Sequence, residues 1–297
     1  MTVLCVSVTG SSMTWRFIIL NLFLTVPGLA QDSTMSAHVS PRMTVGVTTG
    51  TMEFSDQRVQ QGVTGVVRYH ILRAVSVAAS PTVARVAFPS SLGGGSVSGL
   101  TDLPVELAVD HAFDLSWTPT VGLSLGASLP VGDEQVGFGT GGLGANVGVG
   151  LGLSPIEPLS LHLGVGKSLN DYSLSSALGA SSSAWGDVET SYQLLDRVEA
   201  TAGIDGDIAS HDSIGPSRLV ALSLAVNAFG PYTVTVSGGH GLSGAAARWT
   251  LVVGFGSDFE GIKALGSSSP IQRFMRSLGG GSNSGRGSVN SGHGRGP

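Results

Sequence analysis

The chain of 297 residues contains a single cysteine, Cys5, which lies inside a stretch with the features of an export signal. Without a further cysteine the rest of the chain has no disulfide, no thiolate metal site and no cysteine nucleophile. Charged residues make up only 12% of the sequence, about half the usual share in a soluble protein. Aromatic residues are also scarce, at 6%. These shortages argue against a disulfide-rich secreted domain and against a densely charged soluble surface.

A long hydrophobic run is also missing. Mean hydropathy is +0.29. Beyond residue 30, however, no segment approaches the roughly 18 consecutive apolar residues of a membrane helix. Glycine is the commonest residue, with 45 copies. High hydropathy without a long apolar run is what alternating, lipid-facing strands produce.

Residues 1–30 have the parts of a secretory signal. A short basic start at Trp15-Arg16 precedes an apolar core over 17–26, and Gly28-Leu29-Ala30 fits a small-x-small cleavage site. Residues 1–12 make a poor beginning for such a signal, so Met13 is the better start, and it would leave Cys5 untranslated. The sequence therefore predicts a signal peptide over 1–30 and export from the cytoplasm.

Twelve segments after the signal alternate apolar with small or polar residues. In the clearest, 143–153, every odd position is aliphatic or alanine and every even position is glycine or asparagine. A period of two predicts a strand with one apolar face and one bare or polar face. The predicted strands are 39–48, 63–75, 82–88, 103–112, 118–129, 141–153, 159–167, 184–194, 197–205, 218–228, 232–238 and 245–259.

The connections between these segments alternate in length. Links after odd-numbered strands are mostly long, such as 49–62 and 89–102, and links after even-numbered strands are mostly short, such as 76–81. Long outer loops and short periplasmic turns are typical of bacterial outer-membrane barrels. In hydrocarbon only a closed sheet satisfies every backbone group. We therefore predict an all-β protein: an antiparallel, up-and-down transmembrane β-barrel of about twelve strands over 31–259, with its aliphatic face toward outer-membrane lipid.

Aromatic residues should form girdles near the two membrane interfaces of such a barrel. Several lie near ends of predicted strands: Phe113, Trp117, Trp185, Phe229, Tyr232 and Phe259. After Phe259 the alternation stops. Residues 260–278 could include a short amphipathic helix, and the Gly/Ser/Arg-rich remainder to residue 297 is predicted to be a disordered tail.

Several loop motifs resemble a known family. Ser98-Gly99-Leu100-Thr101-Asp102-Leu103 opens a strand, Leu129-Pro130-Val131-Gly132-Asp133 ends one, and Gly137-Phe138-Gly139-Thr140-Gly141 precedes the next. This succession resembles the transporter-like outer-membrane barrels grouped with the phenol-degradation meta-pathway proteins, although Val131 stands where that family usually has threonine. The resemblance covers about residues 96–170, and its motif positions are Asp102, Pro130, Gly132, Asp133, Gly139 and Gly141. It implies an outer-membrane protein that helps to move aromatic or other hydrophobic small molecules.

Charged side chains in the predicted strands are candidates for the lumen. A charge at mid-depth in the lipid costs about 2–4 kcal/mol, so these side chains should point inward. The candidates are Arg42, Arg68, His70, Glu106, Asp110, His162, Glu189 and Arg248. They could line a path or pair across the bore, and the sequence leaves both roles open.

Other chemistries find little support. The glycine-rich 139–144 lacks the following helix and the lysine of a phosphate-binding loop. The histidines show no zinc spacing, and the carboxylates Asp133 and Glu134 are more often solvated than a calcium site. His211, Ser213 and His240 could serve a barrel esterase, but no lipase motif surrounds them. Two arginines in the Gly/Ser tail are too few to indicate nucleic-acid binding.

The sequence therefore predicts no enzyme, no cofactor, no metal and no nucleic-acid partner. The leading hypothesis is an outer-membrane channel or transporter for small, hydrophobic or aromatic molecules. The alternatives are a plugged structural or ligand-binding barrel with functional outer loops, an outer-membrane esterase or phospholipase, and a soluble β-sandwich.

Overall fold

Antiparallel strands make up almost all of the structure. The computed structural model describes residues 43–72, 74–133, 138–139, 141–169, 182–209, 217–243 and 246–257. The strands are β1 (Met43–Glu53), β2 (Val59–Leu72), β3 (Val75–Ala79), β4 (Thr82–Ala87), β5 (Ser96–Leu100), β6 (Leu103–Ala112), β7 (Thr120–Leu129), β8 (Gly144–Ile156), β9 (Leu159–Leu169), β10 (Ser182–Leu195), β11 (Val198–Ala209), β12 (Arg218–Phe229), β13 (Tyr232–Gly241) and β14 (Trp249–Ser257). One 3₁₀ turn, η1 (Ser90–Leu92), lies between β4 and β5. None of the residues described belongs to a helix long and apolar enough to cross a membrane.

Two pairs of these segments are single strands with an interruption. β2 pairs with both β3 and β4 in one continuous register, Val67 opposite Ala79 and Thr64 opposite Thr82. Pro81, which has no N–H to donate, separates the two segments, but its carbonyl still accepts a bond from the Gly65 N–H at 2.9 Å. β5 and β6 likewise pair with β4 and β3 on either side of Thr101-Asp102. The fourteen segments therefore make a barrel of twelve strands, as the sequence predicted.

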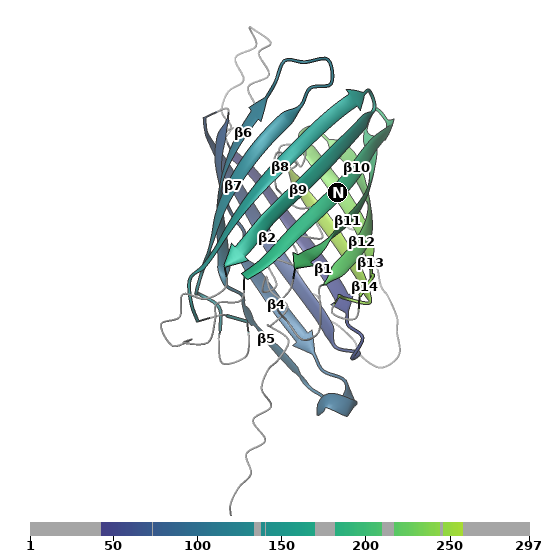
Figure 1. Ribbon diagram of the computed structural model, residues 1–297. Helices are drawn as coiled ribbons and strands as arrows, with labels where there is room; N and C mark the ends of the chain where they lie inside the picture. Colours follow the sequence, from purple (N-terminus) through teal and green to yellow (C-terminus); the bar gives the residue numbers. More distant parts are fainter. Residues whose placement is uncertain are drawn as a thin grey trace, which may run out of the picture. The chain divides into compact units, whose positions relative to one another are not determined.

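The sheet closes on itself. β1 pairs with β2 on one side and with β14 on the other, from Gly46 opposite Gly256 to Glu53 opposite Trp249. Every pairing along the chain is antiparallel, and the closed wall of tilted strands is seen from the side in Figure 1. Closure leaves no open sheet edge, which is the condition for strands to cross hydrocarbon.

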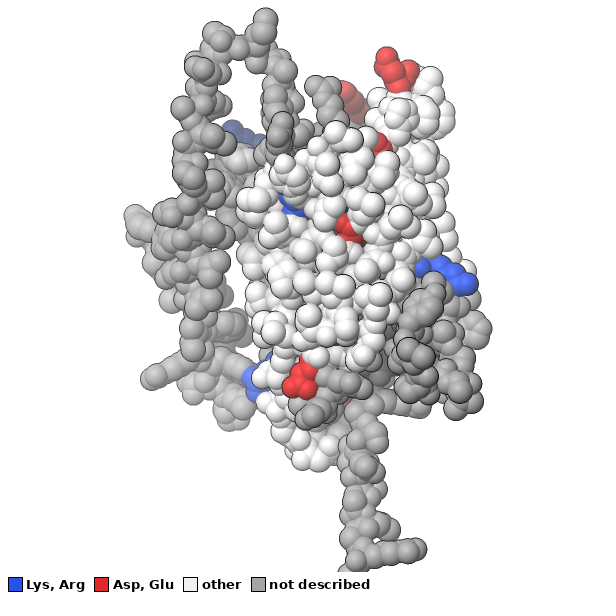
Figure 2. All heavy atoms as spheres, turned by 90° about the vertical axis from the view of Figure 1, so that its left-hand side faces the viewer, with Lys and Arg blue, Asp and Glu red and all other residues white. Residues whose placement is uncertain are grey.

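Successive side chains of each strand point alternately to the outer face of the barrel and to its bore. Val147 and Val149 of β8 are exposed on the outside, whereas Gly148 and Gly150, which alternate with them, face the bore. On β1, Val45 and Val47 are exposed while Thr44 and Thr48 are buried inside. The wall in Figure 2 is almost entirely uncharged, with only a few scattered charged side chains. The aliphatic face is therefore outward and the Gly/Ser/Thr face inward, as expected for a barrel in lipid.

Aromatic side chains gather at one end of the barrel. They are all at least partly exposed and lie near the ends of strands that are joined by short turns: Tyr69, Phe113, Trp117, Tyr192, Phe229, Tyr232 and Phe255. Tyr232 stacks on Phe255 with ring centroids 5.4 Å apart. Trp185, expected near an interface, is instead buried inside the barrel, and Phe259 lies outside the residues described. One aromatic girdle is therefore visible, at the short-turn end.

The two ends of the barrel differ in their connections. At the short-turn end the links are 73–74, 113–119, 157–158, 196–197 and 230–231. The opposite, long-loop end carries the β4–β5 hairpin with η1, which extends past the wall at the bottom of Figure 1, and the longer β7–β8 link. Three expected connections were wrong. The predicted link 89–102 contains strand β5 (Ser96–Leu100), so the loop between β4 and β5 is shorter than expected. β1 and β2 meet at a tight turn over 54–58 rather than a long loop, and residues 76–79 belong to strand β3, because Ser80-Pro81 interrupts a strand without turning the chain.

Candidate functional site

The bore is the candidate site, and one side of it is almost bare. β7, β8 and β9 turn small residues inward, so backbone forms much of the wall there. These residues are Gly122, Ser124, Gly126, Gly148, Gly150, Gly152, Gly164 and Gly166. Rows of glycine such as Gly122 opposite Gly150, and Gly150 opposite Gly164, run straight across the three strands. A wall without side chains leaves room in a barrel of this size, where large side chains would otherwise fill the interior.

Two side chains from β10 lie over part of this bare wall. Trp185, 9% exposed, covers β8 and β9: a Cβ added at Gly148 would stand 3.2 Å from its ring, and one at Gly166 would overlap the ring. Asp187 covers Gly164 in the same way. His162 of β9 approaches Asp187, with Nε2 and Oδ2 3.4 Å apart. The glycines thus accommodate a buried tryptophan and a buried carboxylate inside the bore.

A charged cluster lies on the other side of the bare wall. Arg68 of β2 and Glu106 of β6 sit in one row with Ala78 between them, and Arg68 Nη2 is 3.9 Å from Glu106 Oε1. Arg68 Nη1 also donates to Ser76 Oγ at 3.3 Å, and the arginine is only 3% exposed. Asp110 lies within electrostatic range of both charged partners. The small Ala78 side chain is what allows the ion pair to form across an intervening strand.

Carboxylates follow β10 and β11 along the height of the bore. They share the inward parity of their strands: Asp187, Glu189, Glu199, Asp205 and Asp207. Hydroxyl and amide groups hold several of them. Thr201 Oγ1 donates to Glu199 Oε1 at 3.4 Å, and the Ser217 N–H donates to Asp207 Oδ2 at 3.1 Å. Among the bore-facing strand residues described, carboxylates therefore outnumber guanidinium groups.

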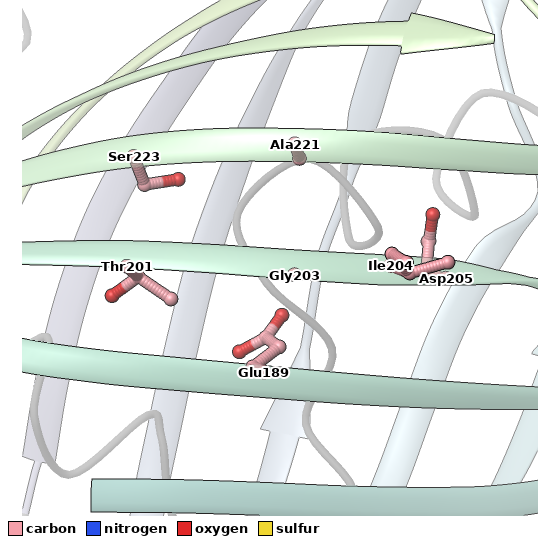
Figure 3. A pocket seen from close by; sticks show the side chains of 7 residues that line it. All are labelled: Glu189, Thr201, Gly203, Ile204, Asp205, Ala221 and Ser223. Carbon is pink, nitrogen blue, oxygen red and sulfur yellow. The ribbon is translucent and has the colours of Figure 1, made fainter. Parts of the chain in front are cut away.

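A small hollow lies among these strands. Figure 3 shows its lining from β10, β11 and β12: Glu189, Thr201, Gly203, Ile204, Asp205, Ala221 and Ser223. Its volume is about 10 Å³, which is room for roughly one water molecule. The hollow is too small for an organic ligand, so any solute must use the bore itself.

The motif that resembles the phenol-degradation family assembles into one structure at the long-loop end. Asp102, 7% exposed, accepts a hydrogen bond from the Gly132 N–H at 3.0 Å through Oδ1. The Asp133 carbonyl then accepts bonds from the Phe138 and Gly139 N–H groups, at 2.8 and 3.2 Å. Pro130 and Gly141 are exposed where the link leaves β7 and approaches β8. The motif residues thus tie the β7–β8 link to the junction between β5 and β6.

An apolar cluster occupies the bore beside this motif. It consists of inward-facing and loop side chains that are buried together: Met52, Ala84, Phe138, Leu219, Ala247 and Val252. Phe54, Val86, Val97 and Ala221 pack against it. The interior is therefore apolar at the long-loop end, whereas hydroxyl and charged groups line most of the remaining wall.

The other residues singled out from the sequence are dispersed. His70 faces the bore from β2 in the row of Ser76, close to the Arg68 cluster. Arg248 precedes β14 and is mostly exposed at the long-loop end, where its Nη1 lies 3.7 Å from Glu53 Oε1. Arg42 and His211 lie outside the residues described, while His240 is exposed on β13. The structure describes no group of three or more His, Cys, Asp or Glu side chains that could hold a metal ion.

Sequence reasoning missed several bore residues. Trp185, Asp187, Glu199, Asp205 and Asp207 were not among the lumen candidates, although each has the parity opposite to the exposed aliphatic residues of its strand. Parity alone would have found them. Phe138 was quoted only as part of a motif, and no local pattern shows that a loop phenylalanine turns into the bore.

Comparisons with known proteins agree on the fold. No family model and no curated protein matches the chain. Among solved structures, the COG4313 outer membrane channel from Pseudomonas putida F1 superposes with a TM-score of 0.57 at 10% identity, covering 72% of this chain and 94% of that one. The NanC porin (TM-score 0.48, 12% identity, 72% and 99% coverage) and the CymD monoaromatic hydrocarbon channel (0.43, 9%, 72% and 87%) are more distant. At these identities the likeness shows that the chain has the fold of an outer-membrane β-barrel, and it shows no more than the fold.

Proposed function

We propose that the protein is an outer-membrane channel through which small molecules diffuse. The observation behind this proposal is that β7, β8 and β9 present mainly glycine and serine to the bore. A barrel that only had to be stable would fill its interior with interlocking side chains, as small barrels do. Here three adjacent strands present glycine and serine to the interior, and the part of this wall around Gly152, which Trp185 and Asp187 do not cover, leaves space in the bore. The outward aliphatic face and the aromatic girdle support a position in the outer membrane, reached through the signal predicted over 1–30.

The proposed solutes are small and hydrophobic or aromatic. The apolar cluster at the long-loop end supports this class, because it places Met52, Phe138 and Val252 inside the bore at that end. The motif resemblance to the phenol-degradation barrels supports the same class. The carboxylates of β10 and β11 disfavour anions. Benzyl alcohol should therefore cross faster than benzoate, since the two molecules have similar size and differ in charge.

A closed, non-transporting barrel is the second candidate. It is favoured by the buried apolar cluster, which fills part of the interior at one end. In that case the outer loops would carry the function, and the interior would serve stability alone.

Two measurements test the proposal. Outer-membrane fractions of a Gram-negative host that expresses the full chain are run on SDS gels with and without boiling, and an unboiled band that migrates faster indicates a closed, detergent-resistant barrel. Purified protein in liposomes is then tested for ion conductance and for flux of benzyl alcohol and benzoate. A folded barrel that passes neither ions nor solutes would contradict the channel and favour the closed barrel. A soluble periplasmic product without a heat shift would contradict the membrane location.

A further inference from the structure

We propose that Phe138 sets the width of the opening at the long-loop end of the bore, and that Asp102 is the positioning residue that holds it there. The inference rests on the proposed channel function and adds the residue that limits solute size. It is drawn from the packing of Phe138, from the hydrogen bonds that fix its loop and from the row of small residues beneath its ring.

Phe138 is a loop residue that is buried like a core residue. It belongs to the link between β7 and β8, yet only 4% of its surface is exposed, and it joins the apolar cluster of Met52, Leu219 and Val252. These partners face inward from β1, β12 and β14, while Ala84 of the same cluster faces inward from β4. The phenyl ring is therefore inside the barrel, among side chains from one arc of the wall that runs from β12 through β14, β1 and β2 to β4.

Small residues form the part of the barrel wall against which the Phe138 ring packs. Gly50, Gly62, Ala84 and Gly99 stand opposite one another in a single row across β1, β2, β4 and β5. A Cβ added at Gly99 would stand 3.0 Å from Phe138 Cδ2, closer than nearly all real contacts. The ring thus rests on Gly99, and a larger residue there would push it further into the bore or out of it.

Hydrogen bonds and close backbone contacts fix Gly132, Asp133, Phe138 and Gly139. Asp102 Oδ1 accepts from the Gly132 N–H at 3.0 Å, and the Asp133 carbonyl accepts from the Phe138 N–H at 2.8 Å. Gly132 and Gly139 also pack closely against neighbouring backbone atoms. A Cβ at Gly132 would stand 2.6 Å from the Phe138 carbonyl oxygen, and one at Gly139 would stand 2.7 Å from the Gly132 carbonyl carbon. A buried carboxylate that accepts a backbone N–H bond is costly to remove, so Asp102 sets where the loop, and with it the ring, is held.

Planar-bilayer conductance of the purified full chain tests the role of the ring. Phe138→Ala should raise single-channel conductance by at least about two-fold and should admit larger neutral sugars in liposome swelling, because a hydrophobic constriction loses its bulkiest group. Phe113→Ala is the matched control, since Phe113 is exposed in the girdle at the opposite end. Heat-shift gels show that each variant is folded, and Phe138→Leu replaces Phe138→Ala if the smaller side chain prevents folding.

Thiol chemistry gives a second measurement. In a Cys5→Ser background, Phe138→Cys is the only thiol of the chain. A benzyl methanethiosulfonate reagent should restore an aromatic group at this position and return the conductance toward the wild-type value. Val131→Cys, in the same loop but exposed, should react without changing conductance.

Two substitutions of Asp102 test whether its hydrogen bond to the Gly132 N–H positions the Phe138 ring. Asp102→Ala should raise the conductance and its open-state noise, because the Gly132 N–H loses its acceptor. Asp102→Asn keeps an oxygen at Oδ1 and should behave like the wild type.

The outcomes separate the two proposals. If the wild type conducts and Phe138→Ala conducts equally, with the same size limit, the role of Phe138 is overturned and the channel stands. If the wild-type protein passes no current and Phe138→Ala does, the result supports the constriction at Phe138 and contradicts the proposal that the wild-type channel is open. If neither conducts, both are overturned.

Discussion

Replacing Gly166 by alanine tests how tightly the interior of the barrel is built. Gly166 faces the bore from β9, where the indole of Trp185 lies across it. A Cβ at this position would overlap the indole and would stand 2.7 Å from the Val147 carbonyl oxygen of the neighbouring strand. The backbone oxygen cannot rotate away, so the barrel wall must shift even if Trp185 changes its rotamer.

The magnitude follows from two opposing contributions. Alanine restricts the unfolded chain more than glycine does, which stabilises a compatible site by about 0.4–1 kcal/mol. Overpacking a closely filled interior costs about 1–3 kcal/mol. At Gly166 the second contribution should dominate and give a net loss of about 1–2 kcal/mol. At Gly152, on β8, an added Cβ meets nothing closer than 3.7 Å, so Gly152→Ala should be neutral or stabilising.

Urea unfolding in lipid vesicles, followed by tryptophan fluorescence and by heat-shift gels, measures both variants against the wild type. The two glycines face the same bore from adjacent strands, so Gly152→Ala is a matched control for residue type and sidedness. Equal unfolding midpoints for the two variants would refute the packing of Trp185 on β8 and β9. A stabilised Gly166→Ala variant would refute the inward direction of this indole altogether.

Three further predictions concern the wall, the charge and the girdle. Val149→Arg on the outer face of β8 should lower the free energy of unfolding by about 2–4 kcal/mol in vesicles, whereas Asn146→Arg on the inner face of the same strand should cost much less; equal losses would contradict the sidedness of the strand. Reversal potentials in a potassium chloride gradient should show cation preference, because carboxylates outnumber Arg68 among the bore-facing side chains described, and an anion-selective current would contradict this. A double-mutant cycle on Tyr232 and Phe255, whose ring centroids are 5.4 Å apart, should give a coupling of about 0.5–1.5 kcal/mol in urea unfolding, and additive losses would count against the stack.

The strands could be predicted from the sequence because alternation is a local property. The segment 103–112 was bounded correctly as β6, although β5 (Ser96–Leu100), the other part of the same barrel strand, was expected to be loop. The twelve-strand count and the closed, antiparallel form are confirmed. The wrong predictions concern segments whose local sequence resembles a turn or a loop. Ser80-Pro81 has the composition of a turn, but the ladder passes through it by way of the Pro81 carbonyl. The strands β1 and β2 extend into 49–53 and 59–62, which were expected to belong to a long loop.

The interior could be predicted only in part, because the meeting of bore residues depends on register between distant strands. Arg68 and Glu106 were both expected to face inward, yet nothing local shows that only Ala78 separates them. The direction of Trp185 was available from parity, since Asp187 two residues later has the same orientation. Trp185 was instead expected in an interface girdle, because it is an aromatic residue near the end of a predicted strand. Phe138 required the loop, the Asp102 junction and the row of Gly99 to be placed together.

The arrangement of bare and charged strands indicates where a solute would pass. The glycine wall of β7–β9 is bordered by Glu106 and Asp110 on β6 and by Asp187 and Glu189 on β10. Trp185 and Asp187 cover the wall toward the long-loop end, while around Gly152 an added Cβ would meet only ordinary contacts. Carboxylates bind water strongly and cost free energy if they are stripped of it, so the borders of the strip favour hydration. The uncovered part of the strip around Gly152 offers space beside them. If the protein is a channel, we expect a neutral solute that has passed Trp185 to move along the uncovered backbone of β8 around Gly152 toward the short-turn end.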